Sequence, residues 1–259
     1  MKTRPLILWD NLIGGEPGPV ITHSDDAEGH PFANLHDWRD YTSWRSSESG
    51  DLFIKLDASS LPGQAVSVDS LAIAGHNLAG AGVENLVLAG SDDDLAYTPC
   101  FEPVTPDDDR VLFRHFPALT RRYFKLTIPE GYAEPPELGV CFIGRALELP
   151  AYPEPGFDPD GQEIECAVEV SRLGRLLGSA ERFRRRELRA SFSRLPSSFI
   201  SGEWLEFWKR HGLLPFFFAW DPDERPGETY LVRLASHRFS SPFERAFRSL
   251  TLELTGLVE

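Results

Sequence analysis

The sequence of 259 residues predicts a mainly β protein, in which an N-terminal β-sandwich precedes a second β domain with one flanking helix. Three observations predict this architecture. Short alternating apolar runs recur through residues 1–149, with turn-forming residues between them, and helix signals are scarce there. Residues 150–162 are rich in Pro and Gly, which disfavour helices and central strands. Residues 163–259 then combine strand patterns with one amphipathic helix.

Eight runs in the first half are expected to be strands of an antiparallel sandwich. In the clearest run, Leu52–Leu56, apolar residues occupy every second position, which is typical of a strand with one buried face. Seven or eight short strands at this spacing predict an antiparallel sandwich. The eight runs are Leu6–Trp9, Val20–Thr22, Leu52–Leu56, Val66–Ala74, Val83–Ala89, Val111–Phe116, Tyr123–Ile128 and Gly139–Leu147.

The second half is expected to contain a helix at about residues 201–211. Ser201 suits the N-cap, basic residues 209–211 suit the negative end of the helix dipole, and Gly212 suits the end of the helix. Trp204 and Trp208 belong to its apolar face. The strands expected around the helix are Ile164–Val170, Leu188–Ser193, Phe216–Trp220, Tyr230–Leu234 and Arg248–Leu257.

The charge of the chain is large, negative and unevenly distributed. The formal net charge is −14, which argues against a general nucleic-acid binder. Residues 1–150 hold 11 basic and 23 acidic residues, whereas residues 151–259 hold 15 and 17. The basic residues of the second half are all Arg except Lys209, and Arg favours bidentate contacts at interfaces. The asymmetry indicates two domains in different surroundings.

Cysteines and apolar runs set expectations for the compartment. The three cysteines, Cys100, Cys141 and Cys166, are far apart and show no CxxC spacing, so we expect free thiols in a protein folded in a reducing cytosol. No signal-peptide pattern occurs at the start, since the apolar run after Arg4 is short. No apolar run approaches ~20 residues, so we expect no transmembrane span.

The sequence contains no motif for catalysis, and we expect no enzymatic activity. It lacks a GxSxG elbow, an HExxH helix and a phosphate-binding glycine loop. We expect no cofactor and no metal ligands. Two acidic loops, Asp92-Asp93-Asp94 and Asp107-Asp108-Asp109, leave open a structural cation with oxygen ligands, although neither has EF-hand spacing and solvated loop tips are favoured. His76, after a buried strand, favours a hydrogen-bonded turn over a base or ligand.

Two groups of residues are candidates for binding. Trp38 and Tyr41 are expected to be exposed and could stack on a sugar ring, whereas Trp44 is expected to point into the core. A subunit interface is the favoured role for the Arg-rich run of the second half, ahead of a solvated strand and of nucleic-acid binding. The run comprises Arg182, Arg184, Arg185, Arg186 and Arg189.

Residues 31–147 resemble a galactose-binding-like, discoidin-type jelly roll. The resemblance is carried by four motifs that occur in the order of that family. They are Asn34-Leu35-x-Asp37 with Trp44-Arg45-Ser46-Ser47, Ile73–Leu78, Val83–Ser91 with its Ser-x-Asp turn, and Arg122–Ile128. The resemblance implies a sandwich that could bind carbohydrate.

The combination with residues 163–259 resembles distal tail and minor tail proteins of long-tailed bacteriophages. The matching features are the strand Arg184–Phe192, the helix around Trp204–Trp208, the strand entered at Leu214, and the closing strand Leu250–Leu257. The familiar distal tail protein has the opposite domain order. This resemblance implies a structural virion protein, made in the host cytoplasm, that forms a homo-oligomeric ring at the tail tip. Its implied partners are the tail tube, the tail hub and other tail-tip proteins. The alternative is a carbohydrate-binding protein that attaches to a host-surface glycan.

Overall fold

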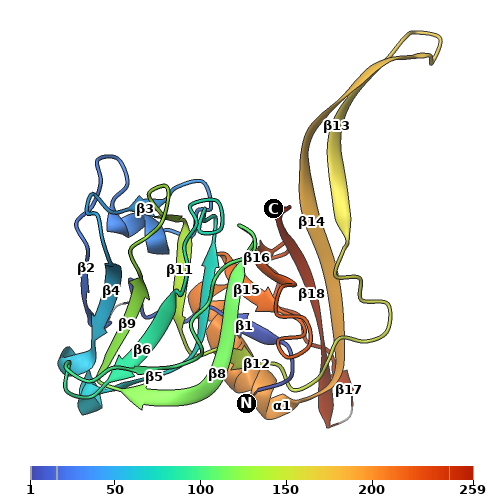
Figure 1. The fold of residues 1–259 in the computed structure, drawn as a ribbon. Coiled ribbons are helices and arrows are strands. Elements are labelled where there is room, and N and C mark those ends of the chain that lie inside the picture. Colours follow the sequence, from blue (N-terminus) through green and yellow to red (C-terminus); the bar gives the residue numbers. More distant parts are fainter. Residues whose placement is uncertain (1, 16, 245, 259) are drawn as a thin grey trace. The chain divides into compact units, whose positions relative to one another are not determined.

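The computed structural model describes residues 2–15, 17–244 and 246–258, and Figure 1 shows a mainly β fold with several antiparallel sheets. The predicted fold class is confirmed: sandwich sheets come first, and a further sheet with a helix follows. By its internal contacts the chain divides into two compact units. Unit 1 comprises Met1–Glu148 and Phe217–Thr229, and unit 2 comprises Leu149–Phe216 and Tyr230–Glu259. No described helix is long and apolar enough to span a membrane.

Unit 1 is built around a β-sandwich. One sheet has the strand order β11-β5-β8 and the other the order β2-β4-β9-β6-β7, with all pairs antiparallel. A two-stranded sheet, β10-β3, lies apart from them in the pairing scheme. The strands are β2 (Val20–His23), β3 (Trp44–Arg45), β4 (Leu52–Asp57), β5 (Val66–Ala74), β6 (Val87–Ser91), β7 (Thr98–Pro99), β8 (Leu112–Arg121), β9 (Tyr123–Ile128), β10 (Glu137–Leu138) and β11 (Val140–Gly144).

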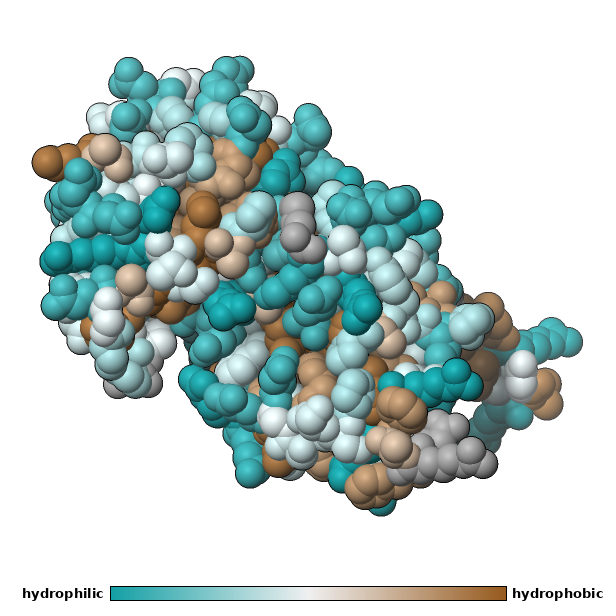
Figure 2. Space-filling model, turned by 90° about the horizontal axis from the view of Figure 1, so that it is seen from below, coloured by the Kyte–Doolittle hydropathy of each residue, from teal (hydrophilic) through white to brown (hydrophobic). Residues whose placement is uncertain are grey.

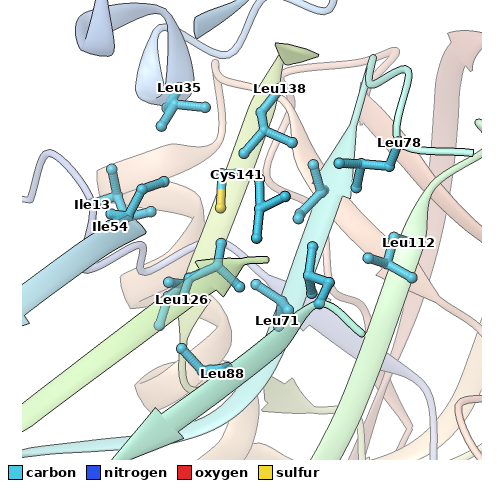
Figure 3. Packing of buried hydrophobic residues seen from close by; sticks show 14 of the residues in the cluster. Ile13, Leu35, Ile54, Leu71, Leu78, Leu88, Leu112, Leu126, Leu138 and Cys141 are labelled. Atoms are coloured by element: carbon cyan, nitrogen blue, oxygen red, sulfur yellow. The ribbon is translucent and has the colours of Figure 1, made fainter. Parts of the chain in front are cut away.

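The core of unit 1 lies between the two sandwich sheets. Figure 3 shows Ile54 and Leu126 from one sheet and Leu71 and Cys141 from the other pointing into a common interior. The alternation in β4 predicts this, because Leu52, Ile54 and Leu56 are buried and their neighbours are half-buried. Three 3-10 turns connect the strands, at Phe32–His36, Ala58–Ser60 and Pro62–Gln64.

Strand pairing outside the sandwich explains why unit 1 includes a late segment of the chain. Strand β1 (Leu6–Leu8) pairs antiparallel with β12 (Leu147–Glu148) and with β15 (Phe216–Ala219). The register places Ile7 opposite both Leu147 and Phe218. All three residues of β1 are completely buried. Because β15 pairs with this buried strand, residues 217–219 belong to unit 1.

Unit 2 contains the strand order β16-β18-β14-β13 and the helix. Strand β14 runs without a break from Leu176 to Pro196, and β17 pairs with β18 near its start. The helix spans residues 197–211, with a π-helical segment at Ile200–Trp204 between α1 (Ser197–Phe199) and α2 (Leu205–His211). The strands are β13 (Gln162–Val170), β14, β16 (Thr229–Leu234), β17 (Phe243–Glu244) and β18 (Phe247–Leu257).

Three elements differ from the sequence-based expectation. The run from Val83 forms turns before β6, because the Val83 N–H donates to the Leu78 carbonyl and delays the strand to Val87. The helix begins four residues before Ser201, whose hydroxyl donates back to the Ser197 carbonyl inside the helix instead of capping it. The expected strand Leu188–Ser193 is only the inner part of the 21-residue β14.

Exposed large apolar side chains are concentrated in one segment. On the face in Figure 2, hydrophilic residues predominate and apolar residues lie in small groups between them. Of the fifteen exposed large apolar side chains in the described residues, seven belong to residues 164–184, which form the outer part of the β13–β14 hairpin. Scattered apolar residues are normal on a surface, but a concentration of this kind indicates a contact surface.

Three histidines of unit 1 lie in environments that oppose their protonation. Burial lowers the pKa of His36, His76 and His115 below the ordinary value of 6.5, and it outweighs the nearby carboxylates that would raise it. The backbone N–H of Lys2 donates to Nε2 of His115 at 3.2 Å, and the Nδ1 of His115 lies 3.1 Å from the Ser70 hydroxyl. Unit 1 therefore contains histidines that fold in the neutral form.

We expect the stability of unit 1 to fall as the pH decreases below about 6.5. The unfolded chain binds protons at these histidines before the folded chain does, so the stabilisation is complete above pH 6.5 and is lost toward the lower folded-state pKa values. The measurement is the free energy of unfolding by urea between pH 8 and pH 5. The variant His76→Gln removes one of these groups and should lose less stability over that range than the wild type; an unchanged slope would contradict the prediction.

Candidate functional site

The hairpin formed by β13 and the outer part of β14 is the main candidate surface, and we call residues 164–184 the arm. Residues 176–184 of β14 pair only with β13, since the pairing of β14 with β18 begins at Arg185. At about 3.3 Å per residue, these nine residues carry the arm about 30 Å past the last rung shared with β18. Figure 1 shows this two-stranded ribbon leaving the sheet of unit 2.

One face of β13 is apolar and exposed along the arm. Ile164, Val168 and Val170 alternate along this strand and are 49%, 54% and 61% exposed. Such a pattern normally marks a strand with one face buried in a core. Here the described chain supplies no core for that face. The exposed Leu176 of β14 is paired with Val170 and adds to the same face, whereas the exposed Phe183 is paired with Glu165 and lies on the opposite face. The arm therefore has the pattern of a buried strand and the surroundings of a surface strand.

The predicted Arg-rich run begins at the base of the arm, which contains Arg182 and Arg184, and continues into β14 below it. Arg184 donates to Glu181 at 2.8 Å, and Arg185 pairs with Glu163 and Glu187. These contacts lower the pKa of Glu163 and Glu181 and raise the pKa of both arginines. Exposed ion pairs contribute little to stability, so these pairs do not account for the folding of so long a two-stranded ribbon.

The other arginines of the run occupy different environments. Arg186 donates to the Pro159 carbonyl at 2.7 Å and lies 3.8 Å from the centre of the Tyr230 ring, which holds it inside unit 2. Arg182 lies exposed on the arm, at the register shift that follows Glu165. Arg189 is exposed, between the buried Leu188 and Ala190. The five arginines therefore do not form one patch with one role.

Trp38 and Tyr41 lie in a loop of unit 1 and differ in exposure. Tyr41 is 78% exposed. Trp38 is only half-exposed, and its ring centre lies 6.5 Å from that of Phe217, which β15 brings into unit 1. Trp44 is 1% exposed and donates from its indole to Asp26 at 3.0 Å, as its expected inward orientation requires. Tyr41 is thus the accessible aromatic of the predicted pair.

Side chains of the Asn-Leu-x-Asp and Trp-Arg-Ser motifs hold this loop in place. The Asn34 amide donates to the Ser43 carbonyl at 2.8 Å, and the Asp37 carboxylate accepts from Arg39 N–H and the Thr42 hydroxyl. Arg45 pairs with Glu137 at 3.2 Å. The loop also passes close to the end of β5: a Cβ at Gly75, which has φ +63°, would lie 2.6 Å from the Asp40 carbonyl oxygen. The motif residues are therefore used within the protein.

The two acidic loops bind groups of the chain itself. Asp93 accepts from the N–H groups of Ala96 and Leu95, which lower its pKa, and Asp94 pairs with Lys55. Asp109 accepts from the N–H groups of residues 79 and 80. Within the described residues, no group of three or more His, Cys, Asp or Glu side chains is placed to hold a metal ion.

His76 is buried at the turn after β5. Its Nδ1 accepts from the Leu78 N–H at 3.3 Å and lies 3.8 Å from Asp109. Burial lowers its pKa. The contacts are those of a hydrogen-bonded turn. None of the sequence motifs identified the arm as a whole, although the alternation of Ile164–Val170 located one of its strands.

Comparison with known proteins gives structural likeness to carbohydrate-binding modules over about half of the chain. No family model and no curated protein matches the sequence. The GH89 module CBM32-6 of Clostridium perfringens matches with 13% identity and a TM-score of 0.41, covering 52% of this chain and 98% of the module. Chitosan-binding module 1 of a chitosanase/glucanase from Paenibacillus sp. IK-5 matches with 18% identity and a TM-score of 0.40, covering 51% and 96%.

A third match is part of a much larger enzyme. The GH29 fucosidase of Ruminococcus gnavus, solved in complex with fucose, matches with 20% identity and a TM-score of 0.43, covering 53% of this chain. The match covers only 27% of the fucosidase chain. At these identities and TM-scores, we carry neither activity nor ligand from these proteins to this chain.

Proposed function

We propose that this protein is a structural assembly protein of a phage tail tip, which forms a ring with copies of itself and acts without turnover of a substrate. In this proposal it resides in the virion after synthesis in the host cytoplasm, and it contacts the tail tube and the tail hub. The observation that carries the proposal is the arm, with its apolar side chains exposed along a two-stranded ribbon.

The physics of an isolated hairpin supports an assembly role. Two strands alone are at best marginally stable in water, and an edge strand with free N–H and C=O groups readily pairs with another chain. Ile164, Val168 and Val170 would each gain hydrophobic stabilisation on burial. A neighbouring subunit that covers this face would supply the missing core, and repeated contacts of this kind build symmetric oligomers.

Cys166 gives a native probe of this proposal. It lies exposed on the arm, whereas burial raises the pKa of Cys100 and Cys141 to about 12 and keeps them protonated. We expect Cys166 to react with a maleimide in dilute protein and to be protected when the protein is concentrated or mixed with its tail tube and hub proteins. Mass photometry of the same samples should show the oligomer. A monomer with unprotected Cys166 in every mixture would contradict the proposal.

A matched pair of variants tests the contribution of the arm. Val168 on the arm and Val20 in unit 1 are both 54% exposed, so glutamate at either position costs little folding energy. Val168→Glu should abolish oligomerisation and Cys166 protection, and Val20→Glu should leave both unchanged. Equal effects of the two substitutions would indicate a general effect of added charge.

The exposed Tyr41 favours carbohydrate binding as a second candidate function. A tyrosine ring that is 78% exposed on a braced loop can stack on a sugar ring at low entropic cost. A glycan array followed by calorimetry on the best ligand tests this. Tyr41→Ala should abolish binding, and Tyr152→Ala, at a 47% exposed tyrosine of unit 2, should not. An array without ligands would refute this function.

A further inference from the structure

Unit 2 contains a pocket of about 280 Å³ whose lining includes no residue of the arm or of the sandwich loops. It opens beside β18, between the residues paired with β17 and those paired with β16. There the chain leaves the sheet edge at Ala235, whose N–H donates to the Glu253 carbonyl, and returns at Pro242, whose carbonyl accepts from the Ser249 N–H. Residues 236–241 lie between these two points, and several of them line the pocket.

The lining of the pocket is aromatic and basic. Trp204 and Trp208 of the helix line it together with Phe239, whose ring centre lies 5.4 Å from that of Trp208. Arg189 and Arg238 lie on the same lining, with Glu253 as the only acid among the lining residues. Neither of these arginines forms an ion pair with a residue that the structure describes. The pocket therefore suits an apolar side chain flanked by carboxylates.

We propose that this pocket receives Leu95 of a second copy of the chain, with Asp92 of that copy beside it. Leu95 is 87% exposed, the highest value among the large apolar side chains described, and it follows Asp92-Asp93-Asp94. Its side chain would fill the aromatic part of the pocket. Asp93 and Asp94 are engaged within the loop, whereas the Asp92 side chain is 68% exposed and lies 3.5 Å from an exposed Arg121, so Asp92 would face Arg189 and Arg238. The inference rests on the proposed function, because it names one contact within the proposed oligomer.

Charge distinguishes this loop from the other very exposed leucine. Leu173, at the tip of the arm, is 86% exposed but lies between Arg172 and Arg175. The two pocket arginines would repel that tip, and like charges at a contact disfavour the wrong partner. By the same rule, the basic tip of the arm favours an acidic partner surface. Acidic surfaces are expected on the first half of the chain, where acidic residues outnumber basic ones.

A contact between Leu95 and this pocket joins two different surfaces of the subunit. Such a heterologous contact makes a ring when the rotation between subunits closes and a filament when it does not. The self-complementary contact of a two-fold dimer would instead bring the same surface of both copies together. The proposal therefore also assigns a polarity to the oligomer: each subunit offers its loop to one neighbour and its pocket to the other.

Cross-linking between two variants, each with one introduced cysteine, tests the contact. In a Cys166→Ser background, one chain carries Ala96→Cys, at the exposed residue next to Leu95, and a second, of different mass, carries Ser240→Cys in the pocket lining. We expect a disulfide-linked heterodimer on mixing under mild oxidation, in excess of the products that either chain forms alone. In the matched control, Leu213→Cys, at a 75% exposed position, replaces Ser240→Cys and should give only background.

Charge reversal adds a second measurement to the same assay. Arg238→Glu in the pocket chain should reduce the heterodimer yield, and Asp92→Lys in the loop chain should restore part of it. If the protein oligomerises with Cys166 protected but no cross-link forms above the control, this contact is wrong while the proposed assembly function stands. If the protein neither oligomerises nor protects Cys166, the assembly function fails, and the contact fails with it.

Discussion

Trp204→Ala is expected to lower the free energy of unfolding of unit 2 by about 3–5 kcal/mol. Trp204 is 3% exposed, and its ring centre lies 5.0 Å from that of Phe207, which is completely buried. Truncation removes a large apolar surface and leaves a cavity that the surrounding helix and strands cannot fill without repacking. The cost should therefore be near the upper end of single-site effects.

Comparison with Trp208→Ala tests whether burial of the ring causes the large cost of Trp204→Ala. Trp208 lies one turn later on the same helix but is only half-buried, at the edge of the pocket, so Trp208→Ala should cost roughly 1–2 kcal/mol. Both values follow from urea unfolding monitored by circular dichroism. Glu206→Ala, at an exposed helix position, serves as the control and should change stability by less than about 0.5 kcal/mol. A Trp204→Ala cost below that control would mean that this helix face is not packed in unit 2.

The sequence predicts elements whose environment repeats regularly along the chain. Leu52, Ile54 and Leu56 alternate because one sheet face contacts the core and the other does not, and the strand was predicted within one residue. The end of the helix at His211 was predicted because Gly212 has a local effect on the backbone. The start was missed because Ser197–Ile200 continue directly from Pro196, without a side-chain cap.

Features that depend on pairing between distant segments could not be predicted. No local signal in Phe217 and Phe218 indicates that they join β1, because Ile7 and Phe218 are more than 200 residues apart. That pairing also places Phe217 beside Trp38 and reduces the exposure expected for this tryptophan. The outer half of β14 has no strand signal in the sequence, because both of its faces are exposed and its residues show no alternation. The pocket beside β18 combines the helix, a strand and a loop, and it has no linear motif.

Asp69→Ala is expected to destabilise unit 1 by about 3–5 kcal/mol. Asp69 lies on β5 with 1% of its surface exposed, and its carboxylate accepts from Lys2 Nζ at 2.6 Å, from the Ala146 N–H at 2.8 Å and from the Ser70 hydroxyl at 2.9 Å. The substitution leaves an ammonium and two neutral donors without this acceptor. Removing one partner of a buried pair costs far more than the net value of the pair, because the other partner remains desolvated.

A double-mutant cycle separates the ion pair from the rest of this network. Lys2→Met removes the ammonium but leaves Ala146 and Ser70 to solvate the carboxylate, and the Lys2 side chain is 22% exposed, so the single change should cost less than Asp69→Ala. The cycle therefore compares Lys2→Met, Asp69→Asn and the double variant; asparagine keeps an acceptor for the neutral donors, and the double variant removes both charges. We expect this double variant to be more stable than the sum of the single effects predicts, with a coupling of about 1–3 kcal/mol in the free energy of unfolding. Strict additivity would show that Lys2 is solvated by water and that the two neutral donors account for the buried position of Asp69.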